Sequence, residues 1–223
     1  MAWRSICFTT SVSHWKGNSY PSTGMSTAIS SLLEIPEVRE QLSPVTLEEY
    51  HAMPERNANG KETELIRGIV IEQMSKSPPH SWFVMFLFKF FLNRIPAGYT
   101  VWSEQPLTLE ESNSEPEPDI AIVKGDDADY RVAHATTAEL VIEVAATKPS
   151  VAIAKAKLSI YADAGIKECW IVDAQKRLVE VYKDPNRGTY TTVVRVAVDR
   201  AIATLKPASF PDIVLPVKEL FPS

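Results

Sequence analysis

The chain has few residues of the kinds that build disulfide-rich, zinc-binding or nucleotide-binding sites. Its 223 residues include 8 glycines and 2 cysteines. The cysteines, Cys7 and Cys169, are far apart in sequence, which excludes a disulfide framework and the usual Cys/His zinc spacings. There is also no glycine-rich phosphate loop and no Ser/His/Asp order typical of a nucleophilic hydrolase. This pattern fits a protein of the reducing cytoplasm that uses other chemistry.

Long apolar runs and an excess of positive charge are also absent. The longest strongly apolar segment, "WFVMFLFKFFL" at 82–92, is too short to span a bilayer and contains Lys89, so it predicts a buried helix and no membrane association. A formal net charge of -5 and a pI near 5.5 exclude a broad basic surface for nucleic acid. Any contact with DNA is therefore expected to be local and transient.

The first part of the chain differs in composition from the rest. It is rich in serine and threonine, has no acidic residue before Glu34, and lacks the compact apolar core of a secretory signal. We expect residues 1–40 to be a disordered extension, with Met25 as an alternative start of translation. Residues 41–223 are expected to form a single domain.

Hydrophobic periodicity predicts an α/β (α+β) fold. A short helix capped by Thr46 precedes two short strands around Gly68, or one bulged strand in their place, and a long core helix ends at Pro96. A second, alanine-rich helix, capped by Ser150 and ending at Gly165, returns the chain to a parallel neighbouring strand. The predicted strands are 99–109, 118–124, 139–146, 169–174, 177–183 and 189–196. The order predicts a central sheet with helices on its faces and a terminal β-meander.

One strand contains a residue that does not suit a buried position. In "ELVIEVAA", Glu143 stands among aliphatic residues, where an unpaired carboxylate is very unfavourable. If this strand pairs antiparallel with the preceding "PDIAIVK", one register brings Asp119 and Glu143 side by side on the same face. Two adjacent carboxylates repel each other, so a positive group is expected between them.

Two cations suit this position. Mg²⁺, or Mn²⁺ in its place, commonly uses one or two carboxylates, and the backbone carbonyl of Val144 could add a ligand. Alternatively, Lys157 emerges from an apolar stripe of the second helix and would need an acidic partner. Near a metal-bound water and a phosphate, this lysine could orient the nucleophile or stabilise developing charge.

Three blocks of the sequence resemble a known family. "EPDIAIV", "LVIEVAATKPS" and "KLSIYADAGIKECWIVD" are similar, in order and spacing, to a bacterial family, abundant in cyanobacteria, described as putative restriction endonucleases of the PD-(D/E)XK nuclease superfamily. The resemblance implies a restriction-endonuclease-like mixed sheet flanked by helices, and Mg²⁺ bound by Asp119 and Glu143. It also matches Glu64 to the acid of the first core segment and Lys157 to a lysine moved from strand to helix.

The sequence departs from the family pattern at three positions. Ala145 stands at the usual superfamily lysine, which this family also typically lacks, Ile153 replaces an acid often found four residues before the helical lysine, and Ala146 replaces a common serine. These changes leave the predicted metal ligands in place but lower the expected catalytic turnover.

Each candidate residue also has a purely structural explanation. Asp119 could be a simple turn residue after Pro118, Glu143 could reach solvent or pair with Lys148, and Glu64 could pair with Arg67. The other three residues have similar alternatives. Lys157 could extend past its neighbours to water, and Tyr161 would be a core aromatic. His80 could contact a phosphate, but its place at a helix start favours a role as a cap.

The leading hypothesis from the sequence is a Mg²⁺-dependent DNA endonuclease. Its site would be formed by Glu64, Asp119, Glu143 and Lys157, with the carbonyl of Val144, and a homodimer would place two such sites across a duplex. The alternative is a catalytically degraded module that binds nucleic acid or protein without cleavage. A glycosidase, which also uses two carboxylates, lacks motif support.

Overall fold

The chain is described by a computed structural model, in two compact units. The structure describes residues 34–54, 60–198 and 203–221. The described part of the first unit, which comprises residues 1–43, contains α2 (Pro36–Arg39), a helix of about one turn. Most of the predicted N-terminal extension, with Cys7 and Met25, lies outside the described residues.

The second unit, residues 44–223, contains the sheet and the candidate site. Its helices are α3 (Leu47–His51), α4 (Pro78–Leu92), the 3₁₀ turn η1 (Glu110–Ser112), α5 (Lys148–Asp163) and α6 (Val217–Leu220). Its strands are β1 (Thr63–Ile66), β2 (Ile69–Glu72), β3 (Tyr99–Ser103), β4 (Ile120–Lys124), β5 (Leu140–Ala145), β6 (Glu168–Asp173), β7 (Leu178–Asn186), β8 (Thr189–Ala197), β9 (Thr204–Leu205) and β10 (Leu215–Pro216).

A mixed six-stranded sheet, in the order β3-β4-β5-β6-β7-β8, is the centre of the unit. Only β5 and β6 are parallel, and α5 connects them, because a parallel connection needs a crossover. The last three strands form an antiparallel meander. The predicted α/β fold, the parallel pair and the terminal meander are confirmed.

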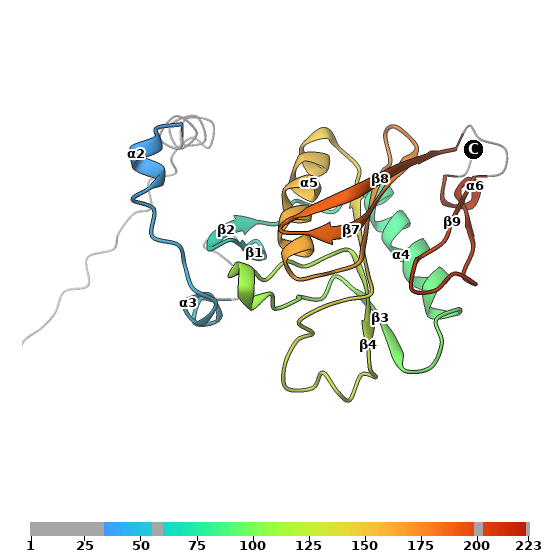
Figure 1. Ribbon diagram of the computed structural model, residues 1–223, viewed down its shortest axis with the longest axis horizontal. Coiled ribbons are helices and arrows are strands. Elements are labelled where there is room, and N and C mark those ends of the chain that lie inside the picture. Colours follow the sequence, from blue (N-terminus) through green and yellow to red (C-terminus); the bar gives the residue numbers. More distant parts are fainter. Residues whose placement is uncertain (1–33, 55–59, 199–202, 222–223) are drawn as a thin grey trace, which may run out of the picture. The chain divides into compact units, whose positions relative to one another are not determined.

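The two long helices cover opposite faces of this sheet (Figure 1). Helix α4 packs on the face of Ile122 and Ile142, where it buries Phe83, Leu87 and Phe91 at helical spacing. Helix α5 packs on the other face with a smaller core that contains Ala154, Ile160 and Tyr161. The site lies where the first turn of α4 and the N-terminal half of α5 meet the sheet and the β1–β2 hairpin.

Three predicted boundaries were wrong. Helix α4 ends at Leu92, with Asn93 as its C-cap, before the predicted end at Pro96. Helix α5 is capped by Thr147, whose side chain accepts a hydrogen bond from the Ser150 backbone N–H, while Ser150 completes a capping box. Pro149 is favourable in the first turn, so the helix starts earlier than predicted. The strand predicted over 99–109 ends at Ser103, because Glu104 takes a left-handed backbone conformation, with φ of 55°.

The hairpin β1–β2 turns at Gly68, which has a positive φ of 76°. A Cβ at Gly68 would overlap the side chain of Pro44. We expect Gly68→Ala to lower the free energy of unfolding by about 2 kcal/mol or more, from overlap and backbone strain together. Gly98→Ala is the matched control, because Gly98 also has a positive φ but has no atom within 4 Å of the position that a Cβ would take. It should lose only about 1 kcal/mol, measured by urea unfolding.

A second prediction concerns Glu180, a buried carboxylate on β7. Burial alone would raise the pKa of Glu180, but hydrogen bonds from Lys155, Arg195 and Tyr182 lower it to about 2. A carboxyl whose pKa is lower in the folded state stabilises the fold above its unfolded pKa of about 4.3, and this stabilisation is lost as the pH falls towards 2. In urea titrations between pH 5 and pH 2, Glu180→Gln should therefore lose less stability than the unmodified chain. Equal losses would contradict this assignment.

Candidate active site

One cavity, at one end of the interior strands β4 and β5, is lined by all five predicted site residues, Val144 included. Glu64 comes from β1, Asp119 directly precedes β4, Glu143 lies on β5, and Lys157 lies on α5. These positions are separated by up to 93 residues in sequence. The fold therefore brings the predicted residues around a single space.

Asp119 and Glu143 meet through the pairing of β4 with β5. The strands are antiparallel with Ile120 opposite Ile142, so continuing the register by one residue places Asp119 opposite Glu143. Oδ2 of Asp119 accepts a hydrogen bond from the backbone N–H of Val144 at 2.5 Å. The predicted antiparallel pairing is confirmed, and Asp119 is anchored to the strand that carries Glu143.

The Glu143 carboxylate is buried and held by two side chains of α5. The residue is 6% exposed, its Oε1 lies 3.3 Å from Nζ of Lys157, and the Tyr161 hydroxyl donates a hydrogen bond to Oε1 at 2.6 Å. Glu143 therefore neither reaches solvent nor pairs with Lys148. Tyr161 is a core aromatic, as its pattern predicts, but its hydroxyl also contacts the site.

Lys157 joins two carboxylates in the cavity. The lysine is 4% exposed, and its Nζ lies 2.6 Å from Oε2 of Glu64. It therefore does not extend to water, and Glu64 does not pair with Arg67, which instead contacts Asp163 at 2.6 Å. Ala145, at the usual superfamily lysine position, is fully buried in the core of the α5 face. The helical lysine supplies the positive charge beside Glu143.

The electrostatics of this group follow from its burial. Burial raises the pKa of Glu143, and Asp119 and Glu64 raise it further, whereas Lys157 and the Tyr161 hydroxyl lower it. Burial alone would lower the pKa of Lys157, but the carboxylates of Glu143 and Glu64 raise it above its ordinary value. The lysine therefore stays charged, and its ammonium group compensates the buried glutamate.

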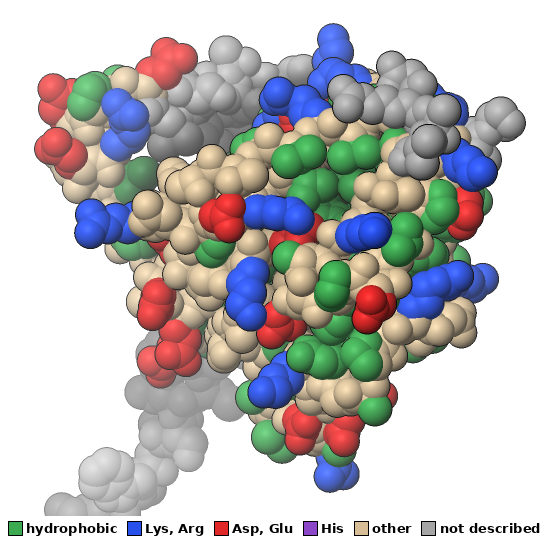
Figure 2. All heavy atoms as spheres, turned by 45° about the vertical axis from the view of Figure 1, so that its right-hand side comes forward, with side chains coloured by type: hydrophobic (Ala, Val, Ile, Leu, Met, Phe, Trp, Pro, Cys, Tyr) green, Lys and Arg blue, Asp and Glu red, His purple; other side chains and the backbone are tan. Residues whose placement is uncertain are grey.

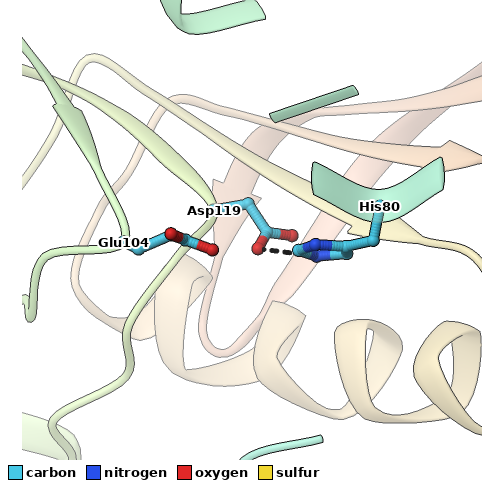
Figure 3. A group of neighbouring side chains, drawn as sticks. All are labelled: His80, Glu104 and Asp119. Atoms are coloured by element: carbon cyan, nitrogen blue, oxygen red, sulfur yellow. Dashed lines mark ion pairs between the residues drawn. The ribbon is translucent and has the colours of Figure 1, made fainter. Parts of the chain in front are cut away.

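A second group of side chains meets at Asp119 (Figure 3). His80, from the first turn of α4, and Glu104, from the residue after β3, approach the Asp119 carboxylate from opposite sides. Nε2 of His80 lies 3.0 Å from Oδ1 of Asp119, and this contact raises the pKa of the imidazole. Lys76 Nζ lies 2.9 Å from Oε1 of Glu104. The three ligand-bearing side chains offer atoms that all lie within 4.8 Å of one another.

Within residues 34–54, 60–198 and 203–221, this is the one set of three or more His, Cys, Asp or Glu side chains that are close enough to hold a metal ion. Glu64, Asp119 and Glu143 do not form such a set, in which all ligand atoms lie within 4.8 Å of one another. The prediction that His80 caps a helix was wrong, because Ser77 is the cap and the imidazole is directed to Asp119. Glu104 was missed altogether.

Comparison with known families decides the assignment of the chain. Residues 47–218 match the profile of the Uma2 family, described as "Putative restriction endonuclease". The chain therefore belongs to the Uma2 family. The match includes every residue of the cavity discussed above, and the predicted resemblance is confirmed. No curated protein matches the chain.

A solved structure has the same fold. It is the crystal structure of "a putative nuclease belonging to DUF820" from Anabaena variabilis ATCC 29413, with a TM-score of 0.64 and 18% sequence identity. The similarity covers 80% of this Uma2-family chain and 98% of that chain. At this identity the comparison supports the fold alone, which agrees with the predicted restriction-endonuclease-like sheet.

One face of the molecule shows how its charged side chains are distributed. On the face in Figure 2, lysine, arginine, aspartate and glutamate side chains are interspersed, and no single basic patch stands out.

Among the described residues, no helix is both long enough and apolar enough to cross a bilayer, and α4 is instead a core helix.

Proposed function

We propose that the chain is a Mg²⁺-dependent endonuclease that hydrolyses DNA phosphodiester bonds, with Mn²⁺ able to replace Mg²⁺. The observation that carries this proposal is the convergence of Glu64, Asp119, Glu143 and Lys157 on one cavity, with the lysine buried between two carboxylates. Membership of a family described as putative restriction endonucleases supports the same reaction class.

The donor set fits a hard divalent cation. The carboxylates of Asp119 and Glu143 and the carbonyl of Val144 are oxygen ligands of the type that Mg²⁺ prefers, and all three residues line the cavity. When bound, such an ion supplies activation of a water molecule and neutralisation of the attacked phosphate.

The chain's own residues have separable roles around the ion. Lys157 would leave its contact with Glu143 and use its ammonium to orient the attacking water and stabilise the developing charge. Glu64, 2.6 Å from Nζ, would keep that ammonium in place and contact the ion directly or through water. Because the molecule is acidic, DNA would be held locally and transiently, and a homodimer would present two cavities to one duplex.

The test is the nicking of supercoiled plasmid by purified full-length protein with Mg²⁺ or Mn²⁺, with and without EDTA. Nicking should require the cation and should be lost in Glu143→Gln. Glu180→Gln is the matched control, since Glu180 is also buried and bonded to a lysine and a tyrosine but lies outside the cavity. Nicking that survives EDTA, or that both variants remove equally, would contradict the proposal.

A second candidate is a module of the same fold that binds without cleaving. Ile153 and Ala146 both line the cavity, at positions where the family often has an acid and a serine. Cation binding by the unmodified chain without nicking under any of these conditions would favour this candidate.

A further inference from the structure

The cavity carries more negative charge than one divalent cation neutralises. Its lining includes two ammonium groups, Lys76 and Lys157, against six carboxylates: Glu64, Glu72, Glu104, Glu117, Asp119 and Glu143. Lys61 offsets one of them from outside the lining, through its contact with Glu72 at 2.9 Å. With His80 neutral, as a metal-binding imidazole must be, a formal excess of three negative charges remains, and a phosphodiester would add another. A single divalent ion therefore leaves the cavity repulsive to its substrate.

The His80, Glu104 and Asp119 side chains form a donor set that Glu143 does not share. They come from three separate parts of the chain, and their ligand atoms lie within 4.8 Å of one another. Nδ1 of His80 is a buried nitrogen that has no hydrogen-bond partner among the described residues. A neutral imidazole has one nitrogen with an available lone pair, and next to two carboxylates it resembles the ligand sets of transition metals.

We propose that His80, Glu104 and Asp119 form a cation site of their own that takes Mn²⁺ or a similar transition metal, and that shares Asp119 with the Mg²⁺ site of the proposed function. Mg²⁺ favours oxygen ligands, so the imidazole makes this site the more selective of the two for a transition metal. The ion takes the place of the Nε2 proton that lies between His80 and Asp119, and this proton moves to Nδ1, the other ring nitrogen. Binding of Glu104 to the ion also releases Lys76. Lys76, about two-fifths exposed, is then free to contact a phosphate.

Manganese binding to the chelator-treated full-length chain tests this site without any activity measurement. Titration followed by electron paramagnetic resonance gives the number of bound Mn²⁺ ions, and the pulsed form of the measurement detects coupling to an imidazole ¹⁴N. The unmodified chain should bind two ions, one with nitrogen coupling. His80→Ala and Glu104→Gln should each lose one ion, and His80→Ala should also lose the nitrogen coupling.

The control is His51→Ala, which removes an imidazole that contacts Glu115 outside the cavity. It should keep both ions and the nitrogen coupling. Glu104→Gln is the variant of choice if His80→Ala misfolds, because Glu104 is partly exposed and glutamine keeps its shape. Unchanged stoichiometry and unchanged coupling in both site variants would overturn the inference.

The outcomes separate this site from the proposed function. In one outcome, the unmodified chain binds one Mn²⁺ with nitrogen coupling, and this ion is lost in His80→Ala but kept in Glu143→Gln. That result supports the His80 site and contradicts the Asp119–Glu143 site. A chain that binds one ion without nitrogen coupling, lost in Glu143→Gln, overturns the His80 site and leaves the proposed function standing.

Discussion

Asp119→Asn is expected to lower the rate of metal-dependent nicking by about 10²–10³-fold or more. Asp119 links the two groups of the cavity: its carboxylate contacts the Val144 N–H and His80, and it lies opposite Glu143 in the sheet. Asparagine keeps the shape and one oxygen acceptor, but it removes the negative charge that a cation requires. The fold should survive while cation binding is lost.

The measurement is plasmid nicking at saturating Mg²⁺, accompanied by Mn²⁺ titration and urea unfolding of the same samples. Asp173→Asn is a suitable control, because Asp173 is also buried and belongs to the block that resembles the family, but it contacts Lys176 outside the cavity. It should retain nicking. If Asp119→Asn nicked DNA at the rate of the unmodified chain, Asp119 would not be a metal ligand.

Asp119→Asn should also lose more bound Mn²⁺ ions than Glu143→Gln. The shared carboxylate belongs to both proposed cation sites, whereas Glu143 belongs to one. Asp119→Asn should therefore bind no Mn²⁺, and Glu143→Gln should keep the ion that shows nitrogen coupling. This difference identifies the residue common to the two sites.

The sequence predicted most of the fold because local rules and packing agree there. The apolar run at 82–92 has the helical spacing of a core helix, and the Thr46 capping box marks the start of α3. The two long strands β7 and β8 flank a turn in which Arg187 and Gly188 have positive φ, as expected for a hairpin. In such segments each local preference points to the observed structure.

The sequence indicated those residues of the candidate site that are unfavourable in an apolar environment without a partner. Glu143 in an apolar strand and Lys157 in an apolar helical stripe both require a partner, and the structure pairs them with each other. Glu104 gave no such signal: it lies in a polar stretch, and only the left-handed backbone after β3 and a backbone hydrogen bond to the Asp119 carbonyl bring it to Asp119. His80 was misassigned because a polar residue near a helix start has the same local pattern as a cap.

Lys157→Met is expected to lower the free energy of unfolding by about 3–5 kcal/mol. Methionine fills a similar volume, so the loss is not one of packing. It arises because Glu143 and Glu64 lose the ammonium that lies 3.3 Å and 2.6 Å from their oxygens, in a place where solvent does not compensate them. Urea unfolding in the presence of EDTA measures this effect without interference from metal ions.

The neighbouring lysine of the same helix provides the control. Lys155 is more exposed, and its partner Glu180 keeps Arg195 and Tyr182, so Lys155→Met should cost less than about 1 kcal/mol. A similar loss in both variants would mean that Lys157 contributes only as an ordinary ion pair.

Divalent cations should reverse part of the loss in Lys157→Met, because ammonium and metal ion compete for the same buried carboxylate. Without the lysine, Glu143 has no competing cation, and Mn²⁺ bound to the folded state alone would raise stability by about 2.7 kcal/mol at a hundredfold excess over its dissociation constant. The double variant Lys157→Met/Glu143→Gln should be more stable than Lys157→Met in EDTA and gain less from Mn²⁺, because its buried charge is gone. If Mn²⁺ stabilised the single and double variants equally, Glu143 would not be a ligand, and Lys157 would be only its structural partner.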